Sequence, residues 1–266
     1  MNILIKNCNL ISMDCNRDKI DYNIDILLKN NKIEKIGSNL PSTDDLKVID
    51  ATGKYVLPGF INTHSHIGMS IFRESVDGYT TQDWLTEKIW PIEDKLTPDD
   101  VYKSSLLSCI EMIKTGTTTV NDQYFFQESI AKAVIESGIR CELTRTIMDI
   151  GGNGDERLEE LENFIKEYNN KYENLYINVG IHGLYTTSEQ CVKKSISLAQ
   201  KYGLNIHMHY LENSKEEQDI IQNQNGKKPF EVVRDNFKNT NSVFAHCVKL
   251  KDDDFKVLSD YNIKVA

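Results

Sequence analysis

From Leu57 onward, short apolar runs alternate with amphipathic segments of helical length, and this alternation restricts the fold more than any other feature of the chain. Repeated strand and helix units of this kind form a parallel sheet that helices cover. The runs with the character of strands are residues 56–64, 117–122, 141–147, 176–183, 204–210, 242–247 and 262–266. A closed barrel of this type needs eight strands. We therefore expect an α/β fold, a TIM-like (β/α)8 barrel with about seven strands present.

The first 56 residues have a different pattern. Apolar and polar residues alternate there in short runs, which asparagine, aspartate and glycine interrupt. This pattern is typical of strands joined by tight turns. We predict two domains: residues 1–56 form a small β domain, the N-terminal part of a composite β-sandwich, and residues 57–266 form the barrel, truncated before strand eight.

Three helices have recognisable start signals. Residues 97–116 begin with a threonine cap, a first-turn proline and two aspartates, and they end at a glycine; these are the residues preferred at helix ends. A second helix is predicted from Ser188 to near Gly203. The sequence Ser-Lys-Glu-Glu at 214–217 has the spacing of a capping box, so we expect a third helix to begin there.

Composition excludes several classes of function. The chain has 40 acidic and 31 basic residues and a net charge of -9, the opposite of the basic surface that binds nucleic acid. Its apolar runs are shorter than the roughly 20 residues of a membrane-spanning helix. Six dispersed cysteines without a CxxC pair are expected to be reduced and mostly buried. We therefore predict a cytoplasmic protein that binds neither nucleic acid nor membranes.

Histidines mark the expected site. All six lie at or near the carboxyl ends of the predicted strands, where barrels of this type build their active sites. His64 and His66 are two residues apart on one strand, so their side chains lie on the same face and can bind one cation. By itself, such a pair is also compatible with two polar residues at a strand end.

The surrounding sequence makes the pair more specific. Its segments are VIDATG (48–53), VLPGFINTHSH (56–66), IWPIE (89–93), KTGTTT (114–119), HMHYLE (207–212) and FAHCV (244–248). Together they resemble the amidohydrolase superfamily, in which the first barrel strand delivers an HxH metal pair after a small β domain. The resemblance extends over essentially the whole chain. It is greatest to the branch that deaminates S-adenosylhomocysteine, methylthioadenosine and 5'-deoxyadenosine.

The resemblance implies a metal centre and its catalytic groups. His64, His66 and His209 would bind one divalent metal, Zn²⁺ in the first place and Fe²⁺ as the alternative. Glu212, three residues after His209, would be a catalytic acid, and the spacing favours His209 over the rival ligand His207. His246 would be a second catalytic residue, beside the metal-bound hydroxide, where it would polarise the hydroxide or hold the substrate. Strand 176–183 has no lysine to bridge two metals, which indicates a mononuclear site.

Four further residues would bind the substrate by the same resemblance. Glu93 would accept hydrogen bonds from ribose hydroxyls, and His182 would contact the nucleoside. Arg145 and Arg157 would approach the 5' substituent. For Arg157 an alternative is pairing with the carboxylates of the acidic stretch 155–162, on a solvated helix.

The resemblance therefore implies hydrolytic deamination of an adenosine-type nucleoside. The metal would lower the pKa of bound water, and Glu212 would protonate purine N1 so that C6 can be attacked and ammonia released. Another amidohydrolase activity, on guanine, cytosine or a triazine, and a non-catalytic scaffold are the alternatives. The family's fourth metal ligand, an aspartate on strand eight, would lie beyond Ala266. We therefore expect this chain alone to be an inactive fragment, and the family permits a homo-oligomer.

Overall fold

The computed structural model describes the chain except for residues 1, 15–18, 75–77 and 81–82. By its internal contacts the chain forms two compact units, Met1–Phe60 and Ile61–Ala266. The domain boundary after residue 56 and the sandwich assignment stay predictions. Each unit is described by itself.

The first unit is a five-stranded mixed sheet with the order β3-β2-β1-β4, and β5 also pairs with β1. Its strands are β1 (Ile3–Leu10), β2 (Asp21–Lys29), β3 (Lys32–Gly37), β4 (Lys47–Asp50) and β5 (Tyr55–Val56). Asn30 and Asn31 join β2 to β3 with positive φ angles, which asparagine tolerates better than most residues. Cys8, Leu10, Ile26 and Ala51 form the small core of this sheet.

The second unit contains a seven-stranded sheet in which the strands follow one another in chain order. They are β6 (Phe60–Ser65), β7 (Thr117–Tyr124), β8 (Arg140–Ile147), β9 (Leu175–Gly183), β10 (Ile206–Tyr210), β11 (Ser242–His246) and β12 (Lys264–Val265). The pairs from β7 to β12 are parallel. Each strand overlaps a run predicted from the sequence. The TIM-like parallel architecture is therefore confirmed.

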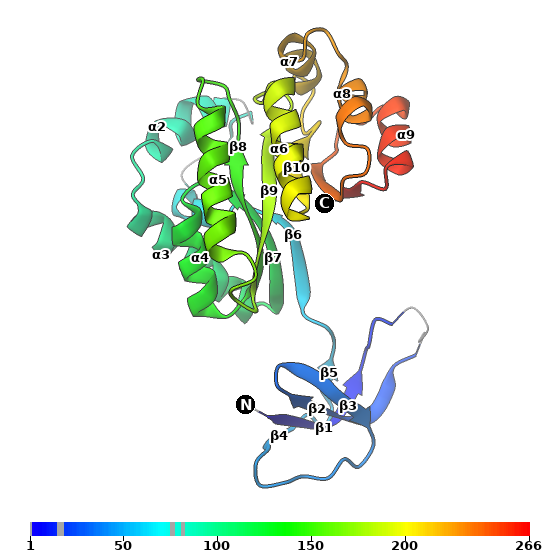
Figure 1. Cartoon of the computed structure of the whole chain (residues 1–266). Helices are drawn as coiled ribbons and strands as arrows, with labels where there is room; N and C mark the ends of the chain where they lie inside the picture. The colour runs from blue at the N-terminus through cyan, green and yellow to red at the C-terminus, as the bar shows by residue number, and fades with distance from the viewer. Residues whose placement is uncertain (1, 15–18, 75–77, 81–82) are drawn as a thin grey trace. The chain divides into compact units, whose positions relative to one another are not determined.

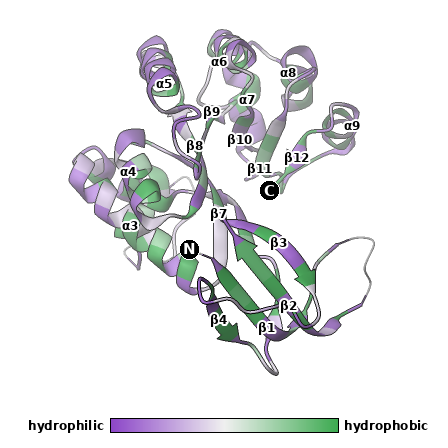
Figure 2. Cartoon of the chain, turned by 60° about the horizontal axis from the view of Figure 1, so that its bottom comes forward, coloured by the Kyte–Doolittle hydropathy of each residue, from purple (hydrophilic) through white to green (hydrophobic). Residues whose placement is uncertain are grey.

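Helices connect successive strands and lie outside the curved sheet (Figures 1 and 2). They are α2 (Trp90–Glu93), α3 (Pro98–Lys114), α4 (Gln127–Ser137), α5 (Gly154–Tyr168), α6 (Glu189–Tyr202), α7 (Glu216–Asn223), α8 (Pro229–Asn236) and α9 (Asp252–Asp260), with a 3-10 turn η1 (Ile67–Phe72) and a π-helical turn η2 (Trp84–Ile89). Their apolar faces and the strands form one core that includes Val120, Leu143, Ile181, Met208 and Phe244. This core fixes the strand ends that carry the site.

Two helix starts agree with the sequence, and one does not. Thr97 and Asp100 form a capping box at α3, and the Ser188 side chain caps α6. The capping box predicted at 214–217 is wrong, because α7 begins at Glu216 without a side-chain cap on its N-cap residue. The Asn213 side chain accepts hydrogen bonds from the next amides instead. Asparagine competes well for such local bonds.

The expectation that most cysteines are buried is confirmed for those that the structure describes. Cys8, Cys109, Cys141 and Cys191 are free and buried, and Cys247 is free and half-buried. Cys15 lies outside the described residues. In the described ranges, the structure has no helix that is both long and apolar enough to cross a membrane.

Candidate active site

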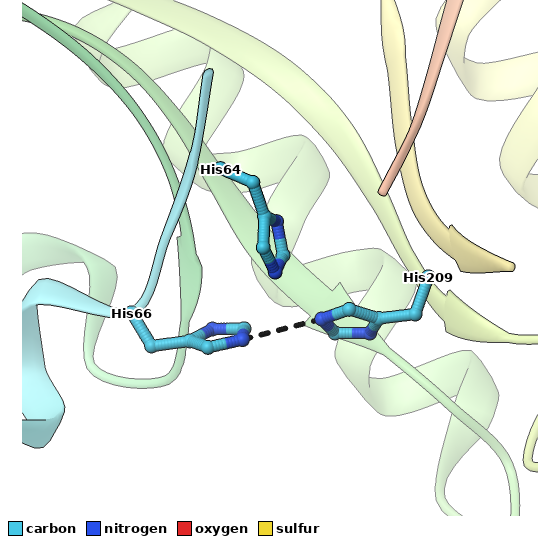
Figure 3. A group of neighbouring side chains, drawn as sticks. All are labelled: His64, His66 and His209. Carbon is cyan, nitrogen blue, oxygen red and sulfur yellow. Dashed lines mark hydrogen bonds between the residues drawn. The ribbon is translucent and has the colours of Figure 1, made fainter. Parts of the chain in front are cut away.

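Three histidines from two strands meet at the carboxyl end of the sheet. His64 is on β6, His66 follows that strand directly, and His209 is on β10. One ring nitrogen of each lies within 4.8 Å of those of the other two. Figure 3 shows the His66 and His209 rings end to end, with the tip of the His64 ring directed toward the gap between them. The strand ends thus place three potential metal ligands together.

The tautomers of His66 and His209 follow from their main-chain partners. The Nδ1 atom of His66 lies 2.5 Å from the Gln123 carbonyl oxygen, and the Nδ1 atom of His209 lies 2.6 Å from the His182 carbonyl oxygen. A carbonyl oxygen only accepts hydrogen bonds, so both Nδ1 atoms must donate. In each neutral ring, Nε2 is then without a proton. Such a partner at the second nitrogen is usual for histidines that bind metals.

The two Nε2 atoms lie 3.2 Å apart, although neither neutral ring has a proton to share. Two lone pairs at this distance repel each other unless a cation lies between them. Two nitrogens that bind Zn²⁺ tetrahedrally at about 2.0–2.1 Å are roughly 3.3 Å apart. The spacing and the donor chemistry therefore fit a divalent cation. This close approach of two ring nitrogens without protons is the observation that carries the metal assignment.

Electrostatics favours neutral ligands. Burial, reinforced by neighbouring histidines, lowers the pKa of His64 to about 2. Burial also lowers the pKa of His66 and, well below its usual range, that of His209. Metal ligands must be deprotonated. These three rings are thus ready to bind a cation without first losing a proton near neutral pH.

His207 occupies a different place from His209. Its Nε2 atom lies 2.9 Å from Nδ1 of His64, and its side chain is almost completely buried. The cluster that could hold a metal contains His209, together with His64 and His66. His207 therefore contacts the Nδ1 atom of the potential ligand His64, whereas His209 belongs to the cluster itself.

Glu212 and His246 lie beside this cluster. Their side chains approach within 3.8 Å, from His246 Nε2 to Glu212 Oε2, and the His246 ring stacks on His209 with 5.4 Å between centroids. His246 and Leu211 both have positive φ angles, where bulky residues are strained. The two strands thus end in unfavourable backbone conformations that turn their chains at the site.

Two buried acids that sequence reasoning missed hold the main chain near the site. Glu216 accepts hydrogen bonds from the amides of Leu211 and Glu212, at 2.8 and 2.7 Å. Asp122 accepts one from the Ile67 amide at 2.6 Å. Burial raises the pKa of both acids, that of Asp122 to about 7. Glu216 lies in an acid-rich segment and Asp122 in a predicted strand. No sequence motif distinguishes either residue.

A cavity of about 330 Å³ opens over the histidines, and its walls carry several predicted residues. Glu93 lines it and accepts a hydrogen bond from the Tyr124 hydroxyl at 2.5 Å. Burial raises the pKa of Glu93. His182 also lines the cavity, and its Nδ1 contacts the Thr186 hydroxyl at 2.7 Å. The walls are completed by apolar side chains, among them Met69, Trp84, Leu85, Ile89, Trp90, Phe125 and Met148.

The two predicted arginines reach this cavity only through an aromatic ring. Phe125 lines the cavity, and the guanidinium carbons of Arg157 and Arg145 lie 5.2 and 6.0 Å from its ring centroid. Arg145 forms an ion pair with Glu160. Arg157 has Nε and Nη1 buried without a hydrogen-bond partner. This differs from an arginine that pairs with carboxylates on a solvated helix.

A curved parallel sheet with a cluster of histidines at its carboxyl edge is the arrangement of a TIM-like barrel with a candidate metal site. The model of the amidohydrolase family matches residues 55–266. The chain belongs to this family.

Two known proteins with similar sequences are deaminases by name. The chain is 39% identical over 267 residues to a 5-methylthioadenosine/S-adenosylhomocysteine deaminase of Caldanaerobacter subterraneus, covering 99% of this chain and 61% of the relative. It is 40% identical over 249 residues to a 5'-deoxyadenosine deaminase of Methanocaldococcus jannaschii, covering 91% and 59%. The chain thus spans about 60% of the length of these relatives.

Solved structures support the fold. An adenosine deaminase of Xanthomonas campestris with bound zinc has a TM-score of 0.90 at 20% identity, over 99% of this chain and 61% of its own. A guanine deaminase of C. acetobutylicum with bound guanine has a TM-score of 0.89 at 22% identity, over 100% and 67%. At this level of identity the similarity shows the barrel fold alone.

Proposed function

We propose that this chain carries the metal centre and a large part of the substrate pocket of a nucleoside deaminase. The reaction is the hydrolysis of S-adenosylhomocysteine, methylthioadenosine or 5'-deoxyadenosine to the inosine analogue and ammonia. The facing Nε2 atoms of His66 and His209, within a cavity that Glu212 also lines, carry this proposal. The names of the similar deaminases point to the same substrates.

His64, His66 and His209 hold one divalent cation, Zn²⁺ in the first place and Fe²⁺ as the alternative. When bound, such a cation acts as a Lewis acid that makes water a stronger acid and therefore a source of hydroxide near neutral pH. The carbonyl oxygens of Gln123 and His182 fix the rings of His66 and His209. Fixed rings preserve the ligand geometry without a rearrangement when the cation binds.

Glu212 transfers the protons of the reaction, and His246 binds the attacking water. Glu212 gives a proton to N1 of the purine, which draws electrons from C6 and allows water to add there. The proton that water loses returns to the carboxylate and is passed to the amino group, which leaves as ammonia. His246, 3.8 Å from Glu212, holds the attacking water by a hydrogen bond. The overall change is water plus an aminopurine to a purinone plus ammonia.

The cavity wall selects a nucleoside over a bare base. Glu93 presents a half-buried carboxylate that can accept hydrogen bonds from the ribose hydroxyls. The Nδ1 contact of His182 with Thr186, which itself donates to the Gly183 carbonyl, leaves the opposite nitrogen of His182 as an acceptor. Arg145 and Arg157 are assigned to the 5' substituent, with Phe125 between them and the cavity. A guanine or triazine needs none of these ribose contacts.

Ammonia release tests the proposal. The protein is loaded with zinc and assayed on S-adenosylhomocysteine, methylthioadenosine, 5'-deoxyadenosine and guanine. Because the chain spans about 60% of its relatives, the assay is run both on this chain and on a hybrid joined to the part of the Caldanaerobacter relative that it does not span. We expect the hybrid to deaminate the nucleosides. Activity on guanine alone would favour another amidohydrolase, and zinc binding without any turnover would favour a non-catalytic scaffold.

A cytosolic location and a homo-oligomer remain parts of this proposal. The scattered free thiols are typical of a reducing compartment.

A further inference from the structure

His64 is held differently from the other two potential ligands. Main-chain carbonyls accept the Nδ1 protons of His66 and His209. The Nδ1 atom of His64 instead lies 2.9 Å from Nε2 of a side chain, His207. A carbonyl fixes the tautomer of its partner because it can only accept. An imidazole can accept or donate, so the His64 tautomer depends on the state of His207.

We propose that His207 is a positioning residue that fixes His64 in the tautomer with its proton on Nδ1, which leaves Nε2 free to bind a cation. The tautomer of His64 exists with or without metal. Only its consequence, that Nε2 of His64 can bind a cation, rests on the proposed metal centre. In the opposite arrangement, Nε2 of His207 would donate to Nδ1 of His64. Nε2 of His64 would then carry the proton and could not be a ligand.

This arrangement leaves the Nδ1 atom of His207 as a buried donor. If Nε2 of His207 accepts, its proton lies on Nδ1, and Nδ1 of His207 is buried without a hydrogen-bond partner. A buried donor without a partner is costly. His207 is only 1% exposed, so water cannot readily relieve the cost. A residue selected for packing alone would not need a polar ring here, whereas a partner for His64 does.

His207 does not compete for the same cation. The two nitrogens of an imidazole direct their lone pairs away from each other, so a group at Nδ1 of His64 lies on the opposite side from a cation at Nε2. In Figure 3 the tip of the His64 ring points toward His66 and His209. A neutral imidazole behind His64 also adds no charge to a site where several histidines are already close together.

Two amide variants place the hydrogen-bonding oxygen of residue 207 at two different positions. In His207→Gln the side-chain oxygen can occupy the place of Nε2, whereas in His207→Asn the shorter side chain places it near Nδ1. Both remove the imidazole and keep a polar side chain. His182→Asn serves as a control, since it removes a different histidine side chain, one that lines the cavity, and the hydrogen bond from His209 uses only the main-chain carbonyl of residue 182.

The first measurement is the histidine ¹⁵N spectrum of the metal-free protein, in which protonated and bare ring nitrogens have well separated shifts. The His64 signals are assigned by their loss in His64→Asn. We expect His64 to have its proton on Nδ1 in the unchanged protein, in His207→Gln and in His182→Asn. In His207→Asn the proton should redistribute between the two nitrogens. A His64 proton on Nε2 in the unchanged protein overturns the proposal.

The second measurement is zinc affinity, determined by competition with a chromophoric chelator. Loss of a partner behind a metal ligand typically weakens binding about 10- to 100-fold, so we expect this loss in His207→Asn and a clearly smaller one in His207→Gln. Equal affinities in both variants, whether weakened or not, contradict a positioning role. If neither the unchanged protein nor the hybrid binds zinc while the tautomers behave as expected, the positioning role stands and the proposed deaminase function fails.

Discussion

The buried carboxylate of Glu216 holds the main chain of Glu212 in place. One oxygen accepts the amide of Glu212 at 2.7 Å and the other accepts the amide of Leu211 at 2.8 Å. Leu211 has a φ of 49°, a strained conformation for a bulky residue. These two charge-assisted bonds stabilise the turn that directs Glu212 into the cavity.

We expect Glu216→Gln to reduce kcat by up to about 100-fold in the hybrid enzyme, because small displacements of a catalytic group are costly. The amide nitrogen of glutamine cannot accept, so one of the two main-chain amides loses its partner. Zinc affinity should stay unchanged, since the carboxylate of Glu216 bonds to the amides of Leu211 and Glu212 and not to the candidate ligand cluster. Glu217→Gln is the matched control, because Glu217 forms a surface ion pair with Lys251. Equal kcat values for both variants would contradict the role of Glu216.

Glu212→Gln separates proton transfer from metal binding. Glutamine has nearly the same shape but cannot donate an acidic proton to purine N1. Removal of a general acid typically costs about 10²- to 10⁴-fold, and we expect a loss of this size in kcat. The chelator competition assay should give the zinc affinity of the unchanged protein. A variant that retains its rate would eliminate Glu212 as the acid, and one that loses zinc would make it a metal ligand.

Glu93→Gln tests recognition of the ribose. Hydrogen bonds to a charged group contribute about 1.5–3 kcal/mol, so KM for methylthioadenosine should rise roughly 10- to 100-fold. Tyr124→Phe removes the hydroxyl that donates to Glu93 and should have a smaller effect. Binding of adenine, measured by calorimetry, should not change, because a bare base has no ribose. Asp94→Asn is the exposed neighbouring control. Equal losses for adenine and nucleoside would mean that Glu93 only maintains the cavity.

The sequence was sufficient for the architecture of the barrel unit. Apolar runs and helix caps are local signals, and chain order is also the strand order. The pairing of His64 with His66 follows from their spacing on one strand. The capping box at 214–217 failed because Asn213 and Glu216 make competing bonds. Such competition depends on which partners the fold brings near, and spacing alone does not reveal it.

Long-range contacts explain what the sequence could not supply. Spacing favoured His209 over His207, yet it gave no indication that His207 contacts His64, which is 143 residues away. The sequence did not predict the burial of Asp122 either, because its partner is the amide of Ile67 on another element. For Arg157, the sequence left a solvated ion pair open as the alternative to substrate binding, whereas the fold buries part of its guanidinium against Phe125. Tertiary packing decides each of these cases.

Asp122 should make stability depend on pH. Burial raises the pKa of this carboxyl from its ordinary 3.8 to about 7 in the fold. Between these values the folded state binds the proton more strongly than the unfolded state. The free energy of unfolding contributed by Asp122 is therefore fully present below about pH 4 and decreases as the pH rises through 7.

Asp122→Asn removes this dependence while its side-chain oxygen can still accept from the Ile67 amide. We compare the free energy of unfolding of the variant with that of the unchanged protein at each pH. The difference, variant minus unchanged protein, should be larger at pH 8 than at pH 4 by at least about 1 kcal/mol, since one pKa unit corresponds to 1.36 kcal/mol. Urea unfolding of the metal-free protein followed by tryptophan fluorescence measures this, because both tryptophans, Trp84 and Trp90, lie in the barrel unit. Asp99→Asn, an exposed carboxylate that pairs with Lys103, should show no comparable change. A stability difference that is constant between pH 4 and 8 would mean that Asp122 stays ionised in the fold.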